Sequence, residues 1–283
     1  MTDMPRIDAH HHVWDLAIRD QPWTVPLAAL RRSFGLDELR PSLQRHHIGA
    51  TVLVQTVCLP EETPELLALA AADPLVCGVV GWADLTAPDV ADKLAALRSL
   101  PGGRLLVGVR HQVQEEPDPR WLCRPDVRRG LAAVAEAGLV YDLVTLAGQL
   151  PAVIETVHAL PGVRFVLDHG GKPDVASGRL EPWRFAVTEL AQCPNVAVKL
   201  SGLATQDDPP SWNLARLQPY ASTLLDAFGP SRTMFGSDWP VCLLAGSYTD
   251  AILGAEQLTA PLNPAERAQV FGDTAARWYP IAA

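Results

Sequence analysis

The strongest constraint on the fold is an alternation of short apolar runs with helical segments, repeated eight times along the chain. Apolar runs rich in β-branched residues predict buried parallel strands, and the Leu- and Ala-rich segments between them predict helices. The predicted strands cover residues 6–9, 50–57, 76–82, 105–110, 139–144, 163–169, 196–201 and 233–238. The predicted helices cover residues 36–46, 61–72, 88–99, 126–137, 149–160, 182–192, 214–228 and 248–257.

Eight such units in 283 residues are what an α/β TIM barrel, (β/α)8, requires. The alternative is an open doubly wound sheet, but no Gly-rich phosphate loop of the form G-x-G-x-x-G or G-x-x-x-x-G-K occurs. We therefore expect residues 1–283 to form one barrel domain with a C-terminal capping helix over residues 264–279. Residues 16–32 lack periodicity and are predicted to form a long loop, which in compact domains is often functional.

Charge and cysteine content narrow the partners and the compartment. A net charge of -9 and a pI near 5.3 argue against binding to nucleic acid or to anionic membranes. The five cysteines stand singly without a C-x-x-C pair, as expected of reduced cytoplasmic thiols, and neither an export signal nor a membrane span is evident. We expect a cytoplasmic protein with a small-molecule partner; the oligomeric state, a homo-oligomer included, is left open.

Polar residues accumulate at the carboxyl ends of the predicted strands, where TIM barrels carry their active sites. Burying such residues is unfavourable unless they are paired or bind a metal, so the accumulation itself indicates a site. In strand order these residues are His10 and His12, Gln55, Trp82 and Asp84, Arg110 and His111, Tyr141 and Asp142, His169 and Lys172, Lys199 and Ser201, and Asp238 and Trp239.

Four of these residues form a candidate metal-binding set. His10 and His12 are spaced i, i+2, so on a strand they point the same way while His11 points to the opposite face. His169 and Asp238 can join them at the barrel mouth, and three imidazoles with one carboxylate suit a zinc-like ion. Asp238 could also take the proton of an attacking water. The alternative is that each histidine is a hydrogen-bonded interior residue.

Six motifs follow one another in strand order and are spread from residue 7 to residue 240. They are I-D-A-H-H-H-V-W-D at 7–15, V-G-W-A-D-L at 80–85, G-V-R-H at 108–111, D-H-G-G-K-P at 168–173, K-L-S-G at 199–202 and G-S-D-W-P at 236–240. This ordered set resembles the amidohydrolase superfamily, specifically amidohydrolase-related group 2, which includes sugar-acid lactonases. The family usually has H-Q-H in the first motif. The resemblance implies metal-binding or catalytic roles for His10, His12, His169 and Asp238.

Two departures from the superfamily pattern bear on the number of metals. Many binuclear members have a bridging Lys or Glu at the end of strand 4 and a His ending strand 5. Here those places hold Arg110 with His111, and Tyr141 with Asp142. We therefore expect one divalent metal, zinc, rather than two. Because some lactonases of this group work without metal, the alternative is a metal-free set of hydrogen-bonding and general-base residues.

The remaining polar residues are assigned to the substrate or to structure. Arg110 could fork onto a carboxylate or lactone oxygen, or form a buried ion pair with Asp84 or Asp142. Lys172, in a Gly-rich turn, could polarise the scissile carbonyl or be a surface lysine. Lys199, inside an apolar strand pattern, is expected in a structural ion pair.

Aromatic residues complete the predicted substrate site. Trp14, Trp23, Trp82 and Trp239 could stack on a sugar ring or merely pack the barrel rim. The residues predicted to bind substrate are Trp14, Gln55, Trp82, Asp84, His111 and Trp239.

These residues lead to the hypothesis of a hydrolase that opens a lactone, the word lactone resting on the resemblance. Asp238 would activate the water, and Arg110 and Lys172 would hold ring substituents or the carbonyl oxygen. One alternative is a metal-dependent decarboxylase of an aromatic or muconate-like acid, and another is a pyrone or muconolactone hydrolase. From a different class, a non-catalytic barrel that binds a sugar acid is a further alternative.

Overall fold

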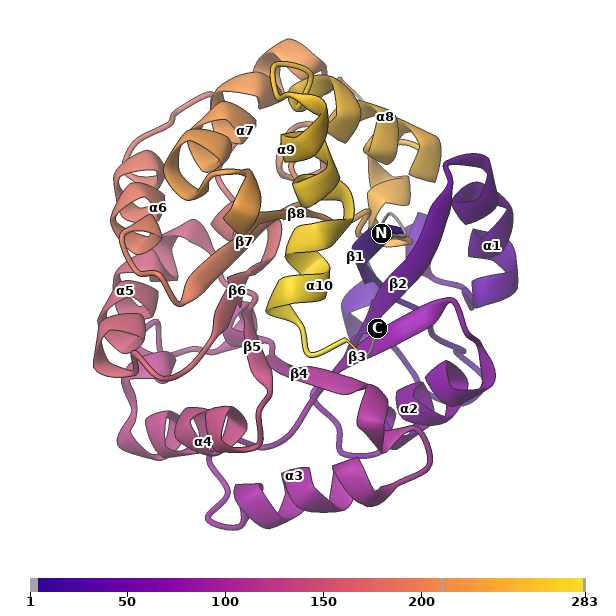
Figure 1. Ribbon diagram of the computed structural model, residues 1–283, viewed down its shortest axis with the longest axis vertical. Coiled ribbons are helices and arrows are strands. Elements are labelled where there is room, and N and C mark those ends of the chain that lie inside the picture. The colour runs from indigo at the N-terminus through magenta and orange to yellow at the C-terminus, as the bar shows by residue number, and fades with distance from the viewer. Residues whose placement is uncertain (1–4, 210, 282–283) are drawn as a thin grey trace.

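The strands form one closed ring of eight. A computed structural model describes residues 5–209 and 211–281, and in it all neighbouring strands pair in parallel in the order β1 to β8 (Figure 1). The predicted TIM barrel is thus confirmed. The strands are β1 (Arg6–His11), β2 (Ile48–Val54), β3 (Val76–Gly81), β4 (Leu106–His111), β5 (Val140–Leu143), β6 (Phe165–Leu167), β7 (Val196–Leu200) and β8 (Thr233–Phe235).

Helices surround the ring, and their bounds lie within two residues of the predicted ones. They are α1 (Leu36–Arg45), α2 (Glu62–Ala72), α3 (Val90–Ser99), α4 (Pro125–Glu136), α5 (Leu150–Ala159), α6 (Trp183–Ala191), α7 (Leu214–Phe228) and α8 (Tyr248–Leu258). The predicted long loop contains only two single 3-10 turns, η1 (Pro22–Thr24) and η2 (Ala28–Leu30). Strands β6 and β8 end earlier than predicted, because the polar residues after them leave the ladder to form the site.

The barrel closes between β8 and β1 through backbone contacts at the mouth. The amide of Asp238 donates to the carbonyl of His10 at 2.8 Å, and the amide of His12 donates to that of Trp239 at 2.7 Å. His11 and Trp239 form an isolated parallel bridge there. The main chain therefore ties His10 to Asp238, and His12 to Trp239, the next residue of the last motif.

The other end of the barrel is closed by the C-terminal segment. Helices α9 (Pro264–Ala268) and α10 (Thr274–Trp278), joined by a π-turn at Gln269–Asp273, take the place of the single predicted capping helix. They cross the strand beginnings in Figure 1, where Gly272 packs against the backbone of Pro5. Trp278 and Tyr279 join the apolar cluster inside the barrel. We call this end the floor.

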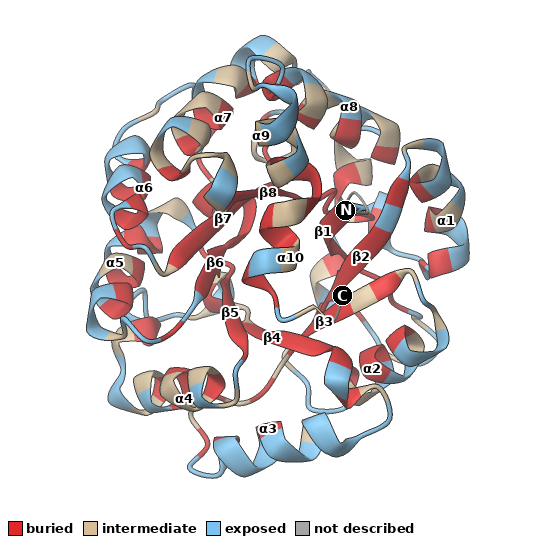
Figure 2. Ribbon diagram, viewed as in Figure 1, coloured by how far each residue is buried: buried red, intermediate tan, exposed pale blue. Residues whose placement is uncertain are grey.

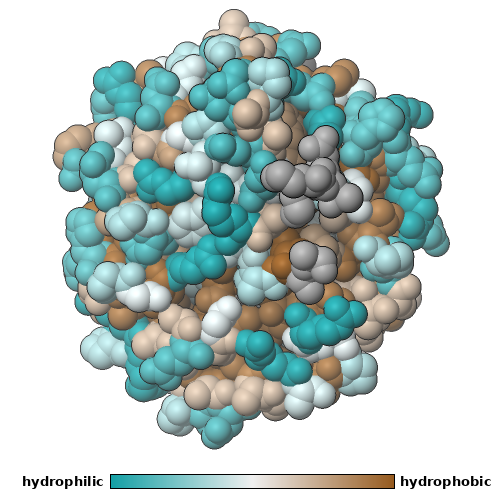
Figure 3. All heavy atoms as spheres, in the orientation of Figure 1, coloured by the Kyte–Doolittle hydropathy of each residue, from teal (hydrophilic) through white to brown (hydrophobic). Residues whose placement is uncertain are grey.

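Two apolar layers support the ring. One lies between the strands and the surrounding helices, and the other fills the barrel interior with small and β-branched side chains. Figure 2 shows the result: the strands are almost entirely buried, and the helices are buried mainly on their inner faces. On the floor side hydrophobic residues show between hydrophilic ones toward the centre (Figure 3). Among residues 5–209 and 211–281, no helix has the length and apolarity needed to cross a membrane.

Candidate active site

A strand irregularity sets the direction of the first two histidines. Ile7 and Ala9 point into the barrel interior, so regular alternation would turn His10 outward. A register shift between Asp8 and His11 in the pairing with β2 instead brings His10 inward beside Ala9. His11 then points away and contacts Thr51 Oγ1 at 3.0 Å, as its parity predicts.

The structure brings together the four residues of the predicted metal-binding set. His10 Nε2 lies 3.1 Å from His12 Nε2, and these two atoms lie 3.6 and 3.4 Å from Asp238 Oδ1. His169 Nε2 approaches the same oxygen at 4.0 Å. All four side chains are buried. Residues from three strand ends, far apart in the sequence, therefore share one small volume at the mouth.

Both later members of the set have left-handed backbone conformations. His169 has φ 54° and Asp238 has φ 57°, values that non-glycine residues adopt at a cost of about 1–2 kcal/mol. Asp8 holds the backbone around Asp238 in place, because Asp8 Oδ1 accepts hydrogen bonds from the amides of Ser237 and His10. Such outliers persist only when surrounding contacts impose them, and they concentrate at functional sites.

The second ring nitrogen of two histidines is also engaged. His12 Nδ1 donates to the carbonyl of Val54 at 2.8 Å, an arrangement in which the neutral imidazole presents Nε2 as its acceptor. His169 Nδ1 lies 2.8 Å from Ser201 Oγ, and Gly202 packs against the same ring, where a Cβ atom would come within 2.9 Å of Nδ1. These contacts fix both rings with Nε2 toward Asp238, the arrangement typical of metal-binding histidines.

Burial determines the charges in the set. Desolvation holds the pKa of His10 well below its usual value and lowers that of His169 to about 4. Burial would raise the pKa of Asp238, but His169, His12 and His10 outweigh it and lower the pKa. At neutral pH these two imidazoles are therefore neutral and the carboxylate is ionised.

This donor set fits a divalent metal. Asp238 Oδ1 is buried and has no hydrogen-bond partner among the described residues. A buried carboxylate oxygen without a partner is unfavourable, and a bound cation would supply that partner. His10, His12 and Asp238 present ligand atoms close enough to share one ion. Nitrogen ligands at the usual zinc distance in tetrahedral geometry lie about 3.3 Å apart, close to the 3.1 Å between His10 and His12.

A buried layer of charges lies beneath the set. Lys199 Nζ lies 2.6 Å from Asp142 Oδ2, 2.9 Å from Asp168 Oδ1 and 3.0 Å from His10 Nδ1. Asp142 Oδ2 also accepts from the Tyr279 hydroxyl at 2.7 Å. Lys199 thus forms the structural ion pair expected from its apolar strand pattern, and the layer connects His10 with the floor.

Arg110 pairs with a different acid from the two predicted. Its Nη1 donates to Asp168 Oδ2 at 3.0 Å, and neither Asp84 nor Asp142 is its partner. Its Nε and Nη2 donate to Gln55 Oε1, and Nη2 also donates to the Gln55 carbonyl. The guanidinium lies 3.4 Å from His10 Nε2. Gln55 and Arg110 are therefore hydrogen-bonded to one another, and their contacts with a substrate remain a prediction.

Three other predicted substrate-binding residues have partners outside the metal-binding set. Trp82 Nε1 donates to His111 Nδ1 at 3.0 Å, and His111 Nε2 lies 2.7 Å from Glu116 Oε1. The His111 ring stacks on Trp121 with centroids 4.2 Å apart. Asp84 accepts from the amide and hydroxyl of Thr86, as in a local turn.

The tryptophans near the first motif pack against one another at the rim. Trp14 meets Trp23 and Phe34 edge to face, and Phe34 meets Trp239 in the same way. The indole N–H of Trp14 donates to the carbonyl of Arg32. These contacts are those of side chains that pack the barrel rim, which was the alternative to stacking on a sugar ring.

Asp8, Asp168 and Ser201 support the set, and each lies in one of the six motifs, but no sequence pattern assigned any of them a specific partner. Asp8 accepts from the amides of His10 and Ser237, Ser201 Oγ lies 2.8 Å from His169 Nδ1, and Asp168 Oδ1 lies 3.4 Å from His10 Nδ1. Gln112 and Gln114 lie in the loop after β4 and had no pattern that could single them out. Their contacts depend on loop geometry.

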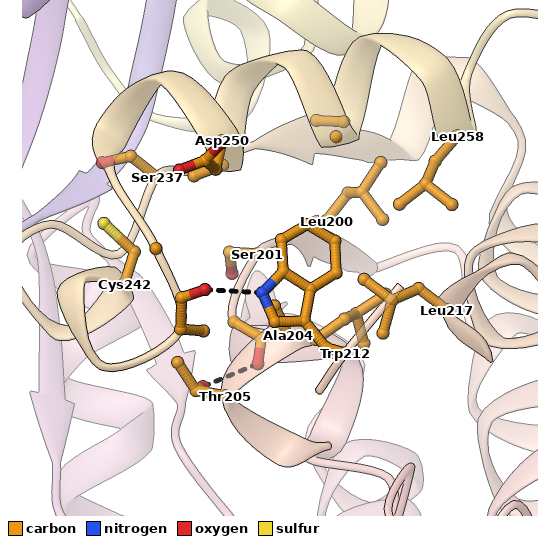
Figure 4. A pocket seen from close by; sticks show the side chains of 18 of the residues that line it. Leu200, Ser201, Ala204, Thr205, Trp212, Leu217, Ser237, Cys242, Asp250 and Leu258 are labelled. Atoms are coloured by element: carbon orange, nitrogen blue, oxygen red, sulfur yellow. Dashed lines mark hydrogen bonds between the residues drawn. The ribbon is translucent and has the colours of Figure 1, made fainter. Parts of the chain in front are cut away.

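A separate cavity lies outside the barrel wall, between β7, β8 and the helices α7 and α8. Figure 4 shows Trp212 in it, its indole N–H donating to the carbonyl of Ala245, with Leu217 and Leu258 nearby. Ser201, which lines this cavity, lies between it and His169. Because it is mainly apolar and holds none of the four residues, it is not the catalytic cavity.

Comparisons with known proteins agree with this geometry. The amidohydrolase family model matches residues 7–281. An L-fucono-1,5-lactonase of Burkholderia ambifaria is 40% identical over 281 residues, which cover 98% of this chain and 96% of that protein. An L-fucono-1,5-lactonase of Burkholderia multivorans is also 40% identical, over 291 residues, with the same coverages. The crystal structure of a Burkholderia multivorans amidohydrolase with bound zinc superposes with a TM-score of 0.92 at 39% identity, covering 98% of this chain and 100% of that one.

Proposed function

The chain belongs to the amidohydrolase family, and we propose that it hydrolyses the ring ester of a sugar-acid lactone. The observation that carries this proposal is the Asp238 carboxylate, ionised and buried, with Oδ1 free of any partner among the described residues and three imidazoles around it. The substrate class is supported by the lactonases that are 40% identical over nearly the whole chain. The decarboxylase and pyrone-hydrolase alternatives are weaker.

Asp238 is suited to carry the proton through the reaction. Its Oδ1 accepts a proton from water as the water oxygen bonds to the lactone carbonyl carbon. When the bond from that carbon to the ring oxygen breaks, the same carboxyl returns the proton to the leaving alkoxide. The products are an open-chain hydroxy acid and an unchanged enzyme. Although burial opposes ionisation, interactions with His169, His12 and His10 lower the pKa of Asp238.

One divalent cation, for which zinc is the favoured candidate, would be held by His10, His12 and Asp238, whose ligand atoms lie together, with His169 Nε2 4.0 Å from Asp238 Oδ1 as the fourth ligand. When bound it would acidify water and polarise the carbonyl. Without it, the same side chains form a hydrogen-bonding and general-base set. Metal content of the purified protein, and a shift of the unfolding temperature on chelation and on zinc addition, distinguish the two.

Lys172 and Arg110 have different roles in this proposal. Arg110 donates its N–H groups to Asp168 and Gln55. It therefore orients the buried charged layer, and its charge makes the potential at the mouth more positive. Lys172 Nζ donates one hydrogen to Gln114, which leaves two for the substrate. Its ammonium therefore is the group that polarises the carbonyl or holds a ring hydroxyl.

A pH-indicator assay tests the function directly. Purified protein is offered a panel of five- and six-membered aldonolactones, with the Asp238→Asn variant as the control. We expect acid release from at least one six-membered lactone and none above background from the variant. No acid release from any lactone, by protein tested both with and without added zinc, would refute the proposal.

A further inference from the structure

Three glutamine side chains form a continuous chain along one side of the mouth. Gln112 Nε2 donates to the Thr56 carbonyl at 3.1 Å and approaches Gln55 Oε1 at 3.4 Å. Gln114 Nε2 approaches Gln112 Oε1 at 3.4 Å, and Gln114 Oε1 accepts from Lys172 Nζ at 2.5 Å. Amide groups thus link β2, the loop after β4 and the turn after β6.

Two cations fix the direction of this chain. Arginine and lysine side chains can only donate hydrogen bonds, so the amide oxygens of Gln55 and Gln114 must face Arg110 and Lys172. Gln112 between them can then satisfy both neighbours in one orientation, with its oxygen toward Gln114. The chain is therefore a preorganised element with defined donors and acceptors.

The end of the chain at Lys172 has donors left over. Lys172 retains two N–H groups and Gln114 Nε2 retains one, and both side chains are only partly buried. Lys172 also has a left-handed backbone, with φ 49° and ψ 66°, in the turn that begins at His169. The Lys172 amide donates to the carbonyl of His169, and His169 Nε2 lies 4.0 Å from Asp238 Oδ1. These free donors thus belong to the mouth that holds the proton-accepting carboxylate.

We propose that Gln114, supported by Gln112, is the specificity-determining residue for the hydroxyl groups of the lactone. It acts in two ways, by holding the Lys172 ammonium where it binds a ring hydroxyl rather than the carbonyl, and by offering its own amide N–H. This inference rests on the proposed function. A cluster of donors suits the oxygen atoms of a polyhydroxylated ring, and a ring without hydroxyls leaves those donors unpaired, which is how polar sites discriminate strongly.

The test compares two lactones that differ in their hydroxyl groups. Wild type, Gln114→Leu and Gln114→Glu are assayed on a polyhydroxylated 1,5-lactone and on unsubstituted δ-valerolactone. Gln192→Leu is the matched control, because Gln192 is exposed on the outside of the barrel. Leucine keeps roughly the size of the side chain but removes both amide functions, whereas glutamate keeps a partner for Lys172 and removes only the N–H donor.

For Gln114→Leu we expect kcat/KM on the hydroxylated lactone to fall about 30-fold or more, mainly through KM, and on δ-valerolactone by less than about threefold. On the hydroxylated lactone, the kcat/KM of Gln114→Glu should lie between those of wild type and Gln114→Leu. Gln192→Leu should have the kcat/KM of wild type on both lactones. Equal losses on both substrates, or no loss with Gln114→Leu, would overturn the inference while leaving the lactonase proposal intact. Wild type inactive on every lactone would instead overturn the proposed function.

Discussion

At the carboxyl ends of the eight strands the barrel carries buried histidines and carboxylates, whereas at the opposite ends it is closed by the side chains of Trp278 and Tyr279. The mouth contains an unpartnered carboxylate oxygen and left-handed non-glycine residues, at His169, Lys172 and Asp238. The floor is apolar. Features that lower stability are gathered where the chemistry is proposed, and apolar packing is gathered at the floor.

The two ends are joined by the buried charges of Asp142, Asp168 and Lys199. Their ion pairs lie between the apolar interior and His10, and Tyr279 contacts them from the floor. Burial raises the pKa of Asp142 to about 6, so Lys199 and Tyr279 have to stabilise its ionised form. This layer is therefore the place where a change at the floor could reach the site.

The largest effect on stability is expected from the floor. Trp278→Ala removes a buried indole that packs inside the barrel end and beneath the guanidinium of Arg164. We expect the free energy of unfolding to fall by about 3–5 kcal/mol and kcat to change less than about threefold. Urea unfolding and lactone turnover measure the two. A fall in kcat well beyond threefold would show that the floor also determines catalysis, and the two ends would no longer be distinct.

An intermediate effect is expected where the floor touches the charged layer. Tyr279→Phe removes the hydrogen bond to Asp142 Oδ2 and should lower the free energy of unfolding by about 1.5–3 kcal/mol, since the acceptor is charged. Tyr220→Phe is the matched control, because the Tyr220 hydroxyl makes only long contacts to neutral carbonyls, 3.3 and 3.4 Å. Equal destabilisation by both variants would show that the charged layer is not supported from the floor.

The smallest effect on stability is expected at the mouth. Lys172→Gly relieves a left-handed backbone conformation, so the free energy of unfolding should stay unchanged or rise by up to about 1 kcal/mol, while turnover falls. His47→Gly is the control, since His47 is exposed, has φ 56° and lies at the end of α1. It should leave turnover unchanged. Full turnover in Lys172→Gly would remove Lys172 from the mechanism.

The sequence was informative wherever topology alone determines position. Eight alternating units place all strand ends on one side, so the convergence of His10, His12, His169 and Asp238 followed from the barrel. The register shift near Ala9 could not be predicted, because it depends on pairing with β2 and on Asp8 reaching Ser237. Despite this shift, His10 and His12 still point the same way and His11 points to the opposite face, as strand parity predicts.

Side-chain partners were harder to predict than positions. Arg110 has several carboxylates within reach of a strand end, and only the turn after β6 brings Asp168 to it. The tryptophans and His111 were predicted to face a substrate, yet their rings and N–H groups meet loop residues whose course has no sequence periodicity. Gln114 could not be singled out for the same reason.

The contrast between mouth and interior can be tested with one matched pair of substitutions. Asp238→Asn and Asp142→Asn make the same chemical change at two buried carboxylates. Lactone turnover and urea unfolding are measured for both, with unfolding recorded after chelation so that metal binding does not contribute.

For Asp238→Asn we expect a loss of turnover of roughly 10³-fold or more, with a free energy of unfolding within about 1 kcal/mol of wild type. For Asp142→Asn we expect a loss of about 3–5 kcal/mol in stability, because Lys199 loses a buried partner, with turnover reduced less than about tenfold. Undiminished turnover in Asp238→Asn would show that this carboxylate does not carry the reaction.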